Sequence, residues 1–117
     1  MHCVKRMSYL RKEEETVEID HSLKKVWMTI QKVLTGLNWN IEQIDEAEHQ
    51  VKAKTKAGPM SWSSALLIDV LPVNENTTRV SVAAETPVTT IMAIVDFRQG
   101  KRRIALFFTE LAKQLAS

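Results

Sequence analysis

Histidine, cysteine and serine are the side chains of this 117-residue chain that metal-binding or nucleophilic chemistry would use first. The three histidines, His2, His21 and His49, stand far apart, and no Glu or Cys accompanies them at the spacing that a zinc site requires. Cys3 is the only cysteine, so neither an internal disulfide nor a multi-cysteine zinc site can form. The sequence therefore predicts no metal site and no cofactor.

The serines and glycines give no catalytic pattern either. Ser61, Ser63 and Ser64 are interpreted as a serine-rich turn, and the sequence identifies no base that could activate one of them. The three glycines stand alone, which excludes a glycine-rich phosphate loop. No catalytic residue is predicted, and we expect a protein that is not an enzyme.

Basic side chains recur at every second position of one predicted strand and return in the last predicted helix. They are Lys52, Lys54, Lys56, Arg98, Lys101, Arg102 and Arg103. Lysines two apart on a strand stand about 7 Å from one another and could follow a phosphate backbone, with Trp62 as a stacking surface. Acidic Glu42, Glu75 and Glu85 are expected on the same face, and the net charge is only +2. Nucleic-acid binding is therefore the less favoured interpretation.

Asp69 interrupts the most apolar predicted strand, where an unpaired carboxylate would be costly to bury. The favoured interpretation is a cross-strand pair with Lys52, Lys54 or Lys56, because opposite charges on neighbouring strands stabilise a sheet.

Two amphipathic stretches predict helices at 22–37 and 98–116. In the first, apolar residues recur at steps of three and four, Asp20 or Ser22 can cap its start, and Gly36 suits its end. In the second, the basic residues, Arg103 among them, are expected on the outer side, opposite an apolar stripe that includes Phe107 and Phe108.

Alternating side chains predict a strand from Glu15 to about His21 and four more between Trp39 and Glu85. The latter cover 39–44, 51–57, 65–71 and 79–85, with short connections that force antiparallel neighbours. The expected fold is α+β, in the order β-α-β-β-β-β-α, with about five antiparallel strands and two helices on one face. Residues 1–14 are expected to form a basic N-terminal arm and 15–117 a single domain.

This layout resembles a reduced helix-grip domain, the fold class of pollen-allergen and START-type lipid carriers, in which a curved sheet wraps a C-terminal helix. It also resembles small uncharacterised prokaryotic α+β domains in which a Ser-Trp pair opens a central strand and a basic helix closes the chain. Here these features are Ser61 and Trp62, and residues 97–103. The resemblance covers roughly residues 15–116 and implies a fold, with no particular activity.

The segment 88–97 holds seven apolar side chains without a clean period. It can complete the core, close as a lid over an apolar pocket, or form a homodimer interface. The candidate pocket or interface residues are Trp27, Trp39, Met60, Trp62, Ile91, Met92, Ile94, Phe97, Phe107 and Phe108. We expect a binding domain that self-associates through 88–97, and the alternative is a small carrier of an apolar ligand held between the sheet and the C-terminal helix.

No apolar run suits a secretory signal or a membrane span. The longest, Val88 to Val95, has eight residues, whereas a spanning helix needs about 20. The expectation is a soluble, cytoplasmic protein.

Overall fold

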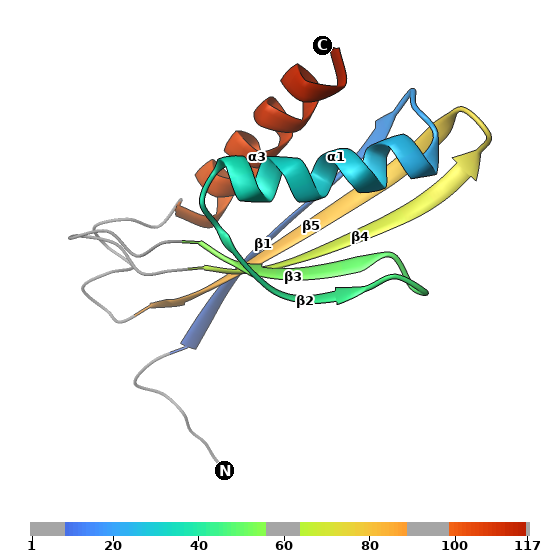
Figure 1. The fold of residues 1–117 in the computed structure, drawn as a ribbon. Coiled ribbons are helices and arrows are strands. Elements are labelled where there is room, and N and C mark those ends of the chain that lie inside the picture. Colours follow the sequence, from blue (N-terminus) through green and yellow to red (C-terminus); the bar gives the residue numbers. More distant parts are fainter. Residues whose placement is uncertain (1–8, 56–63, 89–98, 117) are drawn as a thin grey trace.

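The computed structural model describes residues 9–55, 64–88 and 99–116 (Figure 1). Its elements follow the order expected from the sequence. They are β1 (Tyr9–Ile19), α1 (Leu23–Gly36), β2 (Asn40–Asp45), β3 (Gln50–Lys54), β4 (Ala65–Asn74), β5 (Thr77–Val88) and α3 (Gln99–Ala116).

The strands form one antiparallel sheet in the order β1-β5-β4-β3-β2. Strands β2 to β5 follow one another as a meander, and β1 pairs with β5 along its whole length, from Tyr9 opposite Val88 to Ile19 opposite Thr78. Five antiparallel strands and two helices confirm the predicted α+β fold.

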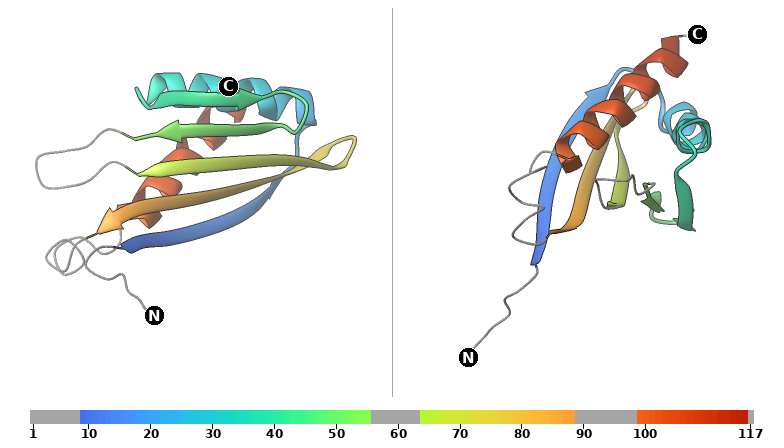
Figure 2. Two further views of the ribbon diagram at one scale, coloured as in Figure 1. Left: turned by 90° about the horizontal axis from the view of Figure 1, so that it is seen from below. Right: turned by 90° about the vertical axis from the view of Figure 1, so that its left-hand side faces the viewer.

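Both helices cover the same face of the sheet (Figure 2). Helix α3 crosses β5 and β1, and α1 lies beside it over the remaining strands. The inward positions of the strands and the apolar stripes of the helices share one core, in which Ile30, Ile68 and Phe107 are completely buried. The burial of such side chains, at about 1.5–3 kcal/mol each, holds the two layers together.

The ends of α1 are set by local hydrogen bonds. Ser22 is the N-cap, and its Oγ accepts the backbone N–H of Lys25 at 3.3 Å. At the other end Asn38, with φ 61°, takes the left-handed conformation, and the N–H of Trp39 donates to the carbonyl of Leu34. Gly36, which the sequence suggested for this role, is the last helical residue, because the chain turns only two positions later.

Some boundaries differ from those expected. Strand β1 begins at Tyr9 and not at Glu15, because pairing with β5 extends the strand over residues that were assigned to the basic arm. Strand β4 continues past Leu71, where the sequence predicted its end, to Asn74, and its register shifts between Pro72 and Asn74. Of the segment 88–97, Val88 ends β5, and the rest lies outside the described residues.

Candidate functional site

Near the first turn of α3, the inner surface of the sheet carries small side chains and one acidic side chain. One row of neighbouring strand residues places Glu13 beside Ala84, Leu66 and Ala53, and the alanines in this row are almost completely buried. Helix α3 comes so close here that a Cβ added to Gly100 would lie 2.8 Å from Cγ of Glu13 and 3.5 Å from Cβ of Ala84. Small side chains and a glycine therefore seat the start of α3 directly on the sheet.

A polar cluster lies at this end of the inner surface. The Nη1 atom of Arg103 donates to Oγ of Ser64 at 2.8 Å, and the backbone N–H of Ser64 donates to Oγ1 of Thr55, also at 2.8 Å. The N–H of Thr55 in turn donates to the carbonyl of Ser64 at 3.0 Å. Ser64 is completely buried and Thr55 nearly so. We call Thr55, Ser64 and Arg103 the Arg103 cluster.

The direction of Arg103 corrects the sequence analysis, which placed it on the outer side of the last helix. It is half-buried and points toward the sheet, in line with Gly100 and Phe107 on the facing side of α3. That spacing of three and four residues was the available signal, but a basic residue on a helix ordinarily indicates a solvated face. Ser64, predicted as part of a serine-rich turn, is likewise an interior hydrogen-bonding group.

The cluster can act on an oxygen atom. A guanidinium stays protonated in proteins, so Arg103 can donate hydrogen bonds and stabilise negative charge but cannot serve as a base. The hydroxyl of Ser64 can donate as well as accept. A carboxylate lies at the same end of the sheet as the Arg103 cluster. It belongs to Glu13, which lies on the inner face of β1 beneath Gly100.

A shallow groove of about 350 Å³ opens toward the other end of α3, between this helix and the last part of β1. Its lining is mainly apolar and its rim polar. The lining residues are Val17, Glu18, Ile19, Asp20, His21, Phe108, Leu111, Ala112, Leu115 and Ala116.

The aromatic residues predicted to line one pocket are dispersed. Trp27 belongs to α1, and its side chain reaches the β2–β3 turn, where Nε1 donates to Oε1 of Glu46 at 3.0 Å and the ring meets His49 edge to face. Trp39 directly precedes β2, at the opposite end of that strand. Phe107 is buried in the core, whereas its neighbour Phe108 lines the groove. The remaining candidates, Met60, Trp62, Ile91, Met92, Ile94 and Phe97, lie outside the described residues.

The predicted basic patch is divided between the two sides of the sheet. Lys52 and Lys54 are exposed on the face opposite the helices, because Val51 and Ala53, which alternate with them, enter the core. Lys101 and Arg102 are exposed on α3, on the helical side, and Arg103 turns inward. Lys56 and Arg98 lie outside the described residues.

Asp69 does not face a lysine across a strand pair. The register places it opposite Gln50 on β3 and Ser81 on β5, and Lys52 is opposite Leu67. The expected pair between Asp69 and a lysine is therefore wrong, because the nearest lysine of β3, Lys52, stands opposite Leu67. The sequence alone does not determine this register.

Within residues 9–55, 64–88 and 99–116, no group of three or more His, Cys, Asp or Glu side chains gathers in a way that could hold a metal ion. None of the helices described is long and apolar enough to cross a membrane.

The sheet order, the two helices on one face and the inner site beneath α3 define the helix-grip fold, and solved structures of that fold match over most of the chain. Truncated norcoclaurine synthase from Thalictrum flavum superimposes with a TM-score of 0.71 at 12% identity, covering 97% of this chain and 98% of that one. The ZhuI aromatase/cyclase from Streptomyces sp. R1128 gives 0.63 at 11% identity, covering 92% and 96%. A protein from Thermobifida fusca gives 0.65 at 12%, covering 88% and 91%.

At the level of sequence, no family model matches the chain, and neither does any curated protein. The structural likeness thus establishes the fold and confirms the helix-grip resemblance. It also overturns the prediction that the protein is not an enzyme, since a synthase and an aromatase/cyclase share this architecture. That prediction excluded an enzyme because the sequence shows no metal or nucleophile motif. This criterion is not sufficient for a fold whose members include enzymes.

Proposed function

We propose that the protein binds a small, largely apolar molecule between the sheet and α3, and that the Arg103 cluster holds a polar atom of that molecule. The observation that carries this proposal is the hydrogen bond from Arg103 to the completely buried Ser64 at 2.8 Å. A charged group turned into the space between two apolar layers is costly unless hydrogen bonds compensate it. Such groups therefore often mark binding sites.

The surroundings favour an aromatic ligand that carries oxygen. The polar groups of the Arg103 cluster lie beside the apolar core, and apolar sites with few polar groups are typical of small-molecule binding. A structure of norcoclaurine synthase with dopamine and hydroxybenzaldehyde has the same fold, which supports this class of ligand.

A reaction on that ligand is compatible with the cluster. Arg103 and Ser64 would donate to a carbonyl or phenolic oxygen and stabilise negative charge that develops on it, a contribution that is large where water is excluded. We assign no general base, because the described residues give no geometry for the proton that it would remove.

The experiment measures binding of 2-naphthol and of naphthalene by displacement of the fluorescent dye 8-anilinonaphthalene-1-sulfonate. The wild-type protein should prefer naphthol, because a hydrogen bond to a charged donor is worth about 1.5–3 kcal/mol, or roughly ten- to hundredfold in affinity. Arg103→Met and Ser64→Ala should lose this preference and still bind naphthalene. Arg79→Met, on the face opposite the helices, is the matched control.

Two results would contradict the proposal. One is dye binding that Arg103→Met leaves unchanged but Ala112→Glu abolishes, because the ligand would then occupy the groove between β1 and α3. The other is a wild-type protein that binds neither compound. Thermal unfolding of each variant confirms that the fold is retained.

A further inference from the structure

The face of the sheet opposite the helices carries an apolar strip along its central strand. Leu67 and Leu71 of β4 are 36% and 51% exposed, Ala65 lies on the same side of the strand, and Asp69 stands between the two leucines. None of the described elements covers this face, since both helices lie on the other one (Figure 2). Exposed apolar side chains grouped on one uncovered face are typical of an interaction site.

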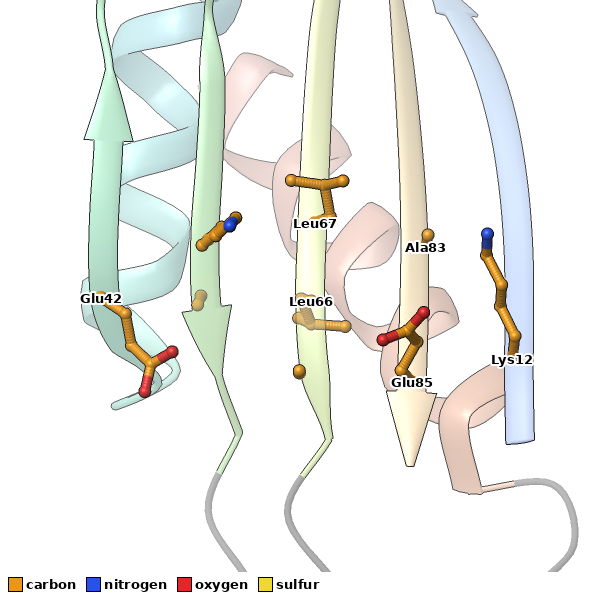
Figure 3. A pocket seen from close by; sticks show the side chains of 9 residues that line it. Lys12, Glu42, Leu66, Leu67, Ala83 and Glu85 are labelled. Atoms are coloured by element: carbon orange, nitrogen blue, oxygen red, sulfur yellow. The ribbon is translucent and has the colours of Figure 1, made fainter. Parts of the chain in front are cut away.

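Charged side chains flank the strip: Lys52 and Lys54 stand on β3 with Glu42 beyond them on β2, and Glu85 stands on β5 with Lys12 opposite it on β1. Lys54, Ala65 and Glu85 form one row across β3, β4 and β5, so the lysine and the glutamate stand on either side of the apolar strand. Lys52 and Glu85 also border a shallow depression of about 320 Å³ around Leu67 (Figure 3). Within the described residues, neither lysine forms an ion pair with Glu85 or any other carboxylate.

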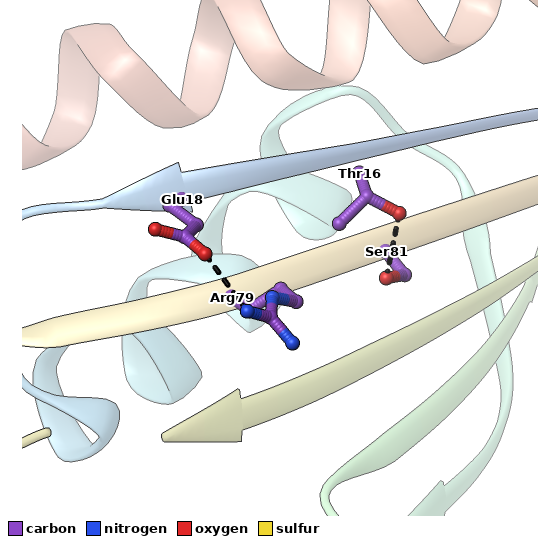
Figure 4. Close-up of polar contacts among 4 residues, drawn as sticks. All are labelled: Thr16, Glu18, Arg79 and Ser81. Atoms are coloured by element: carbon purple, nitrogen blue, oxygen red, sulfur yellow. Dashed lines mark hydrogen bonds and ion pairs between the residues drawn. The ribbon is translucent and has the colours of Figure 1, made fainter. Parts of the chain in front are cut away.

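The polar side chains farther along β1 and β5 are satisfied within the chain. Arg79 pairs with Glu18 at 2.9 Å, and the hydroxyls of Thr16 and Ser81 lie 2.9 Å apart (Figure 4). Lys12, Glu42, Lys52 and Glu85, in contrast, line the depression around Leu67.

We infer that this face binds a second copy of the chain, with a twofold axis running along β4. Such an axis places β3 of one copy over β5 of the other, so Lys54 of each meets Glu85 of its partner on both sides of the axis. The stem of Lys52 then covers Ala83, and the leucines of the two β4 strands meet at the centre. Sheets that pack face to face keep their strands within about 30° of each other, as this arrangement requires.

Charge decides between the possible axes. A twofold axis running across the strands would place β3 over β3 and bring the lysines of the two copies together. Of these two axes, only the axis along β4 places Lys54 of each copy next to Glu85 of the other, so opposite charges attract on both sides of the axis. The axis also brings Asp69, on β4 itself, near its own copy, so this one like-charged pair opposes association.

The available surface suits a dimer. Five strands at about 4.8 Å spacing and about 30 Å of strand length give roughly 700 Å², before side-chain relief is added. A standard protein interface buries about 800 Å² on each partner.

Sedimentation velocity over a concentration series tests this inference. The wild-type protein should approach twice the chain mass of 13.3 kDa, and Leu67→Asp should stay monomeric. Leu106→Asp, at a 45% exposed leucine on α3, should still dimerise. Glu85→Lys and Lys54→Glu should each weaken the dimer about tenfold or more, and the double variant should regain affinity. Asp69→Asn should strengthen it.

A monomeric wild-type protein at the highest concentration would overturn the inference. So would a dimer that survives Leu67→Asp, including one that Ile91→Asp dissociates, because association would then use the segment 88–97. The charge-exchanged pair keeps the test valid if Leu67→Asp does not fold. If the double variant is as weak as the single ones, the proposed axis is wrong. The outcome is independent of ligand binding by the Arg103 cluster.

Discussion

Replacing Gly100 by alanine should destabilise the protein, although the same change ordinarily stabilises a helix. Alanine is more favourable than glycine in a helix by about 1 kcal/mol. Here the new methyl group would lie 2.8 Å from Cγ of Glu13, well inside the normal separation of about 3.5–4.0 Å between carbon atoms. Overpacking of this kind costs about 1–3 kcal/mol, so the net free energy of unfolding should fall by up to about 2 kcal/mol.

Gly36 provides the matched control, because it is also helical. A Cβ added there finds its nearest neighbour, Nε2 of Gln114, at 3.9 Å, which is an ordinary contact. Gly36→Ala should therefore raise the free energy of unfolding by about 0.5–1 kcal/mol. Urea unfolding followed by circular dichroism measures both variants, and an unchanged m-value shows that the comparison is sound.

A double-mutant cycle with Glu13→Ala identifies the cause. Removing the side chain under the helix should make Gly100→Ala favourable again, with a coupling energy of about 1 kcal/mol or more between the two positions. If Gly100→Ala stabilises the protein as much as Gly36→Ala does, and the cycle gives no coupling, α3 does not rest on β1 and the seating of the Arg103 cluster must be reconsidered.

Two other substitutions test the core and the end of α1. Phe107→Ala should lower the free energy of unfolding by about 3–5 kcal/mol, because Phe107 is completely buried. Leu106→Ala, at its exposed neighbour, should change it by no more than about 0.5 kcal/mol. Equal losses for the two variants in urea unfolding would contradict the assigned faces of α3. Asn38→Gly should preserve or slightly raise the thermal midpoint, whereas Asn38→Ala should lower the stability by about 1 kcal/mol, since φ of 61° suits glycine and asparagine. Indifference of the midpoint to both changes at Asn38 would refute the left-handed turn.

The fold could be predicted from sequence because its signals are local. Apolar residues at steps of three and four identified α1, and alternation from Gln50 to Lys54 identified which residues of β3 enter the core. Short connections then left little choice but an antiparallel meander. The start of β1 was missed, since the residues from Tyr9 onward are held in the sheet by β5 and not by a pattern of their own.

The candidate site could not be predicted in the same way, because its contacts are not local. Arg103 and Ser64 are 39 residues apart, and the direction of Arg103 depends on where α3 crosses the sheet. The sequence predicted Trp27 at a pocket or an interface, and it gave no sign that this side chain contacts Glu46 and His49 of a turn. Asp69 shows the limit for charges, because a shift of two residues in register decides which side chain it faces.

The pairing of β1 with β5 has a consequence for the order of folding during synthesis. The strands from Asn40 onward can assemble with near neighbours, but β1 must wait until residues up to Val88 have left the ribosome. Such distant pairings form late and slowly, because a long loop must close first. Until then the nascent chain presents an open flank on β5, which is the stage at which a chaperone or a neighbouring chain could compete for it.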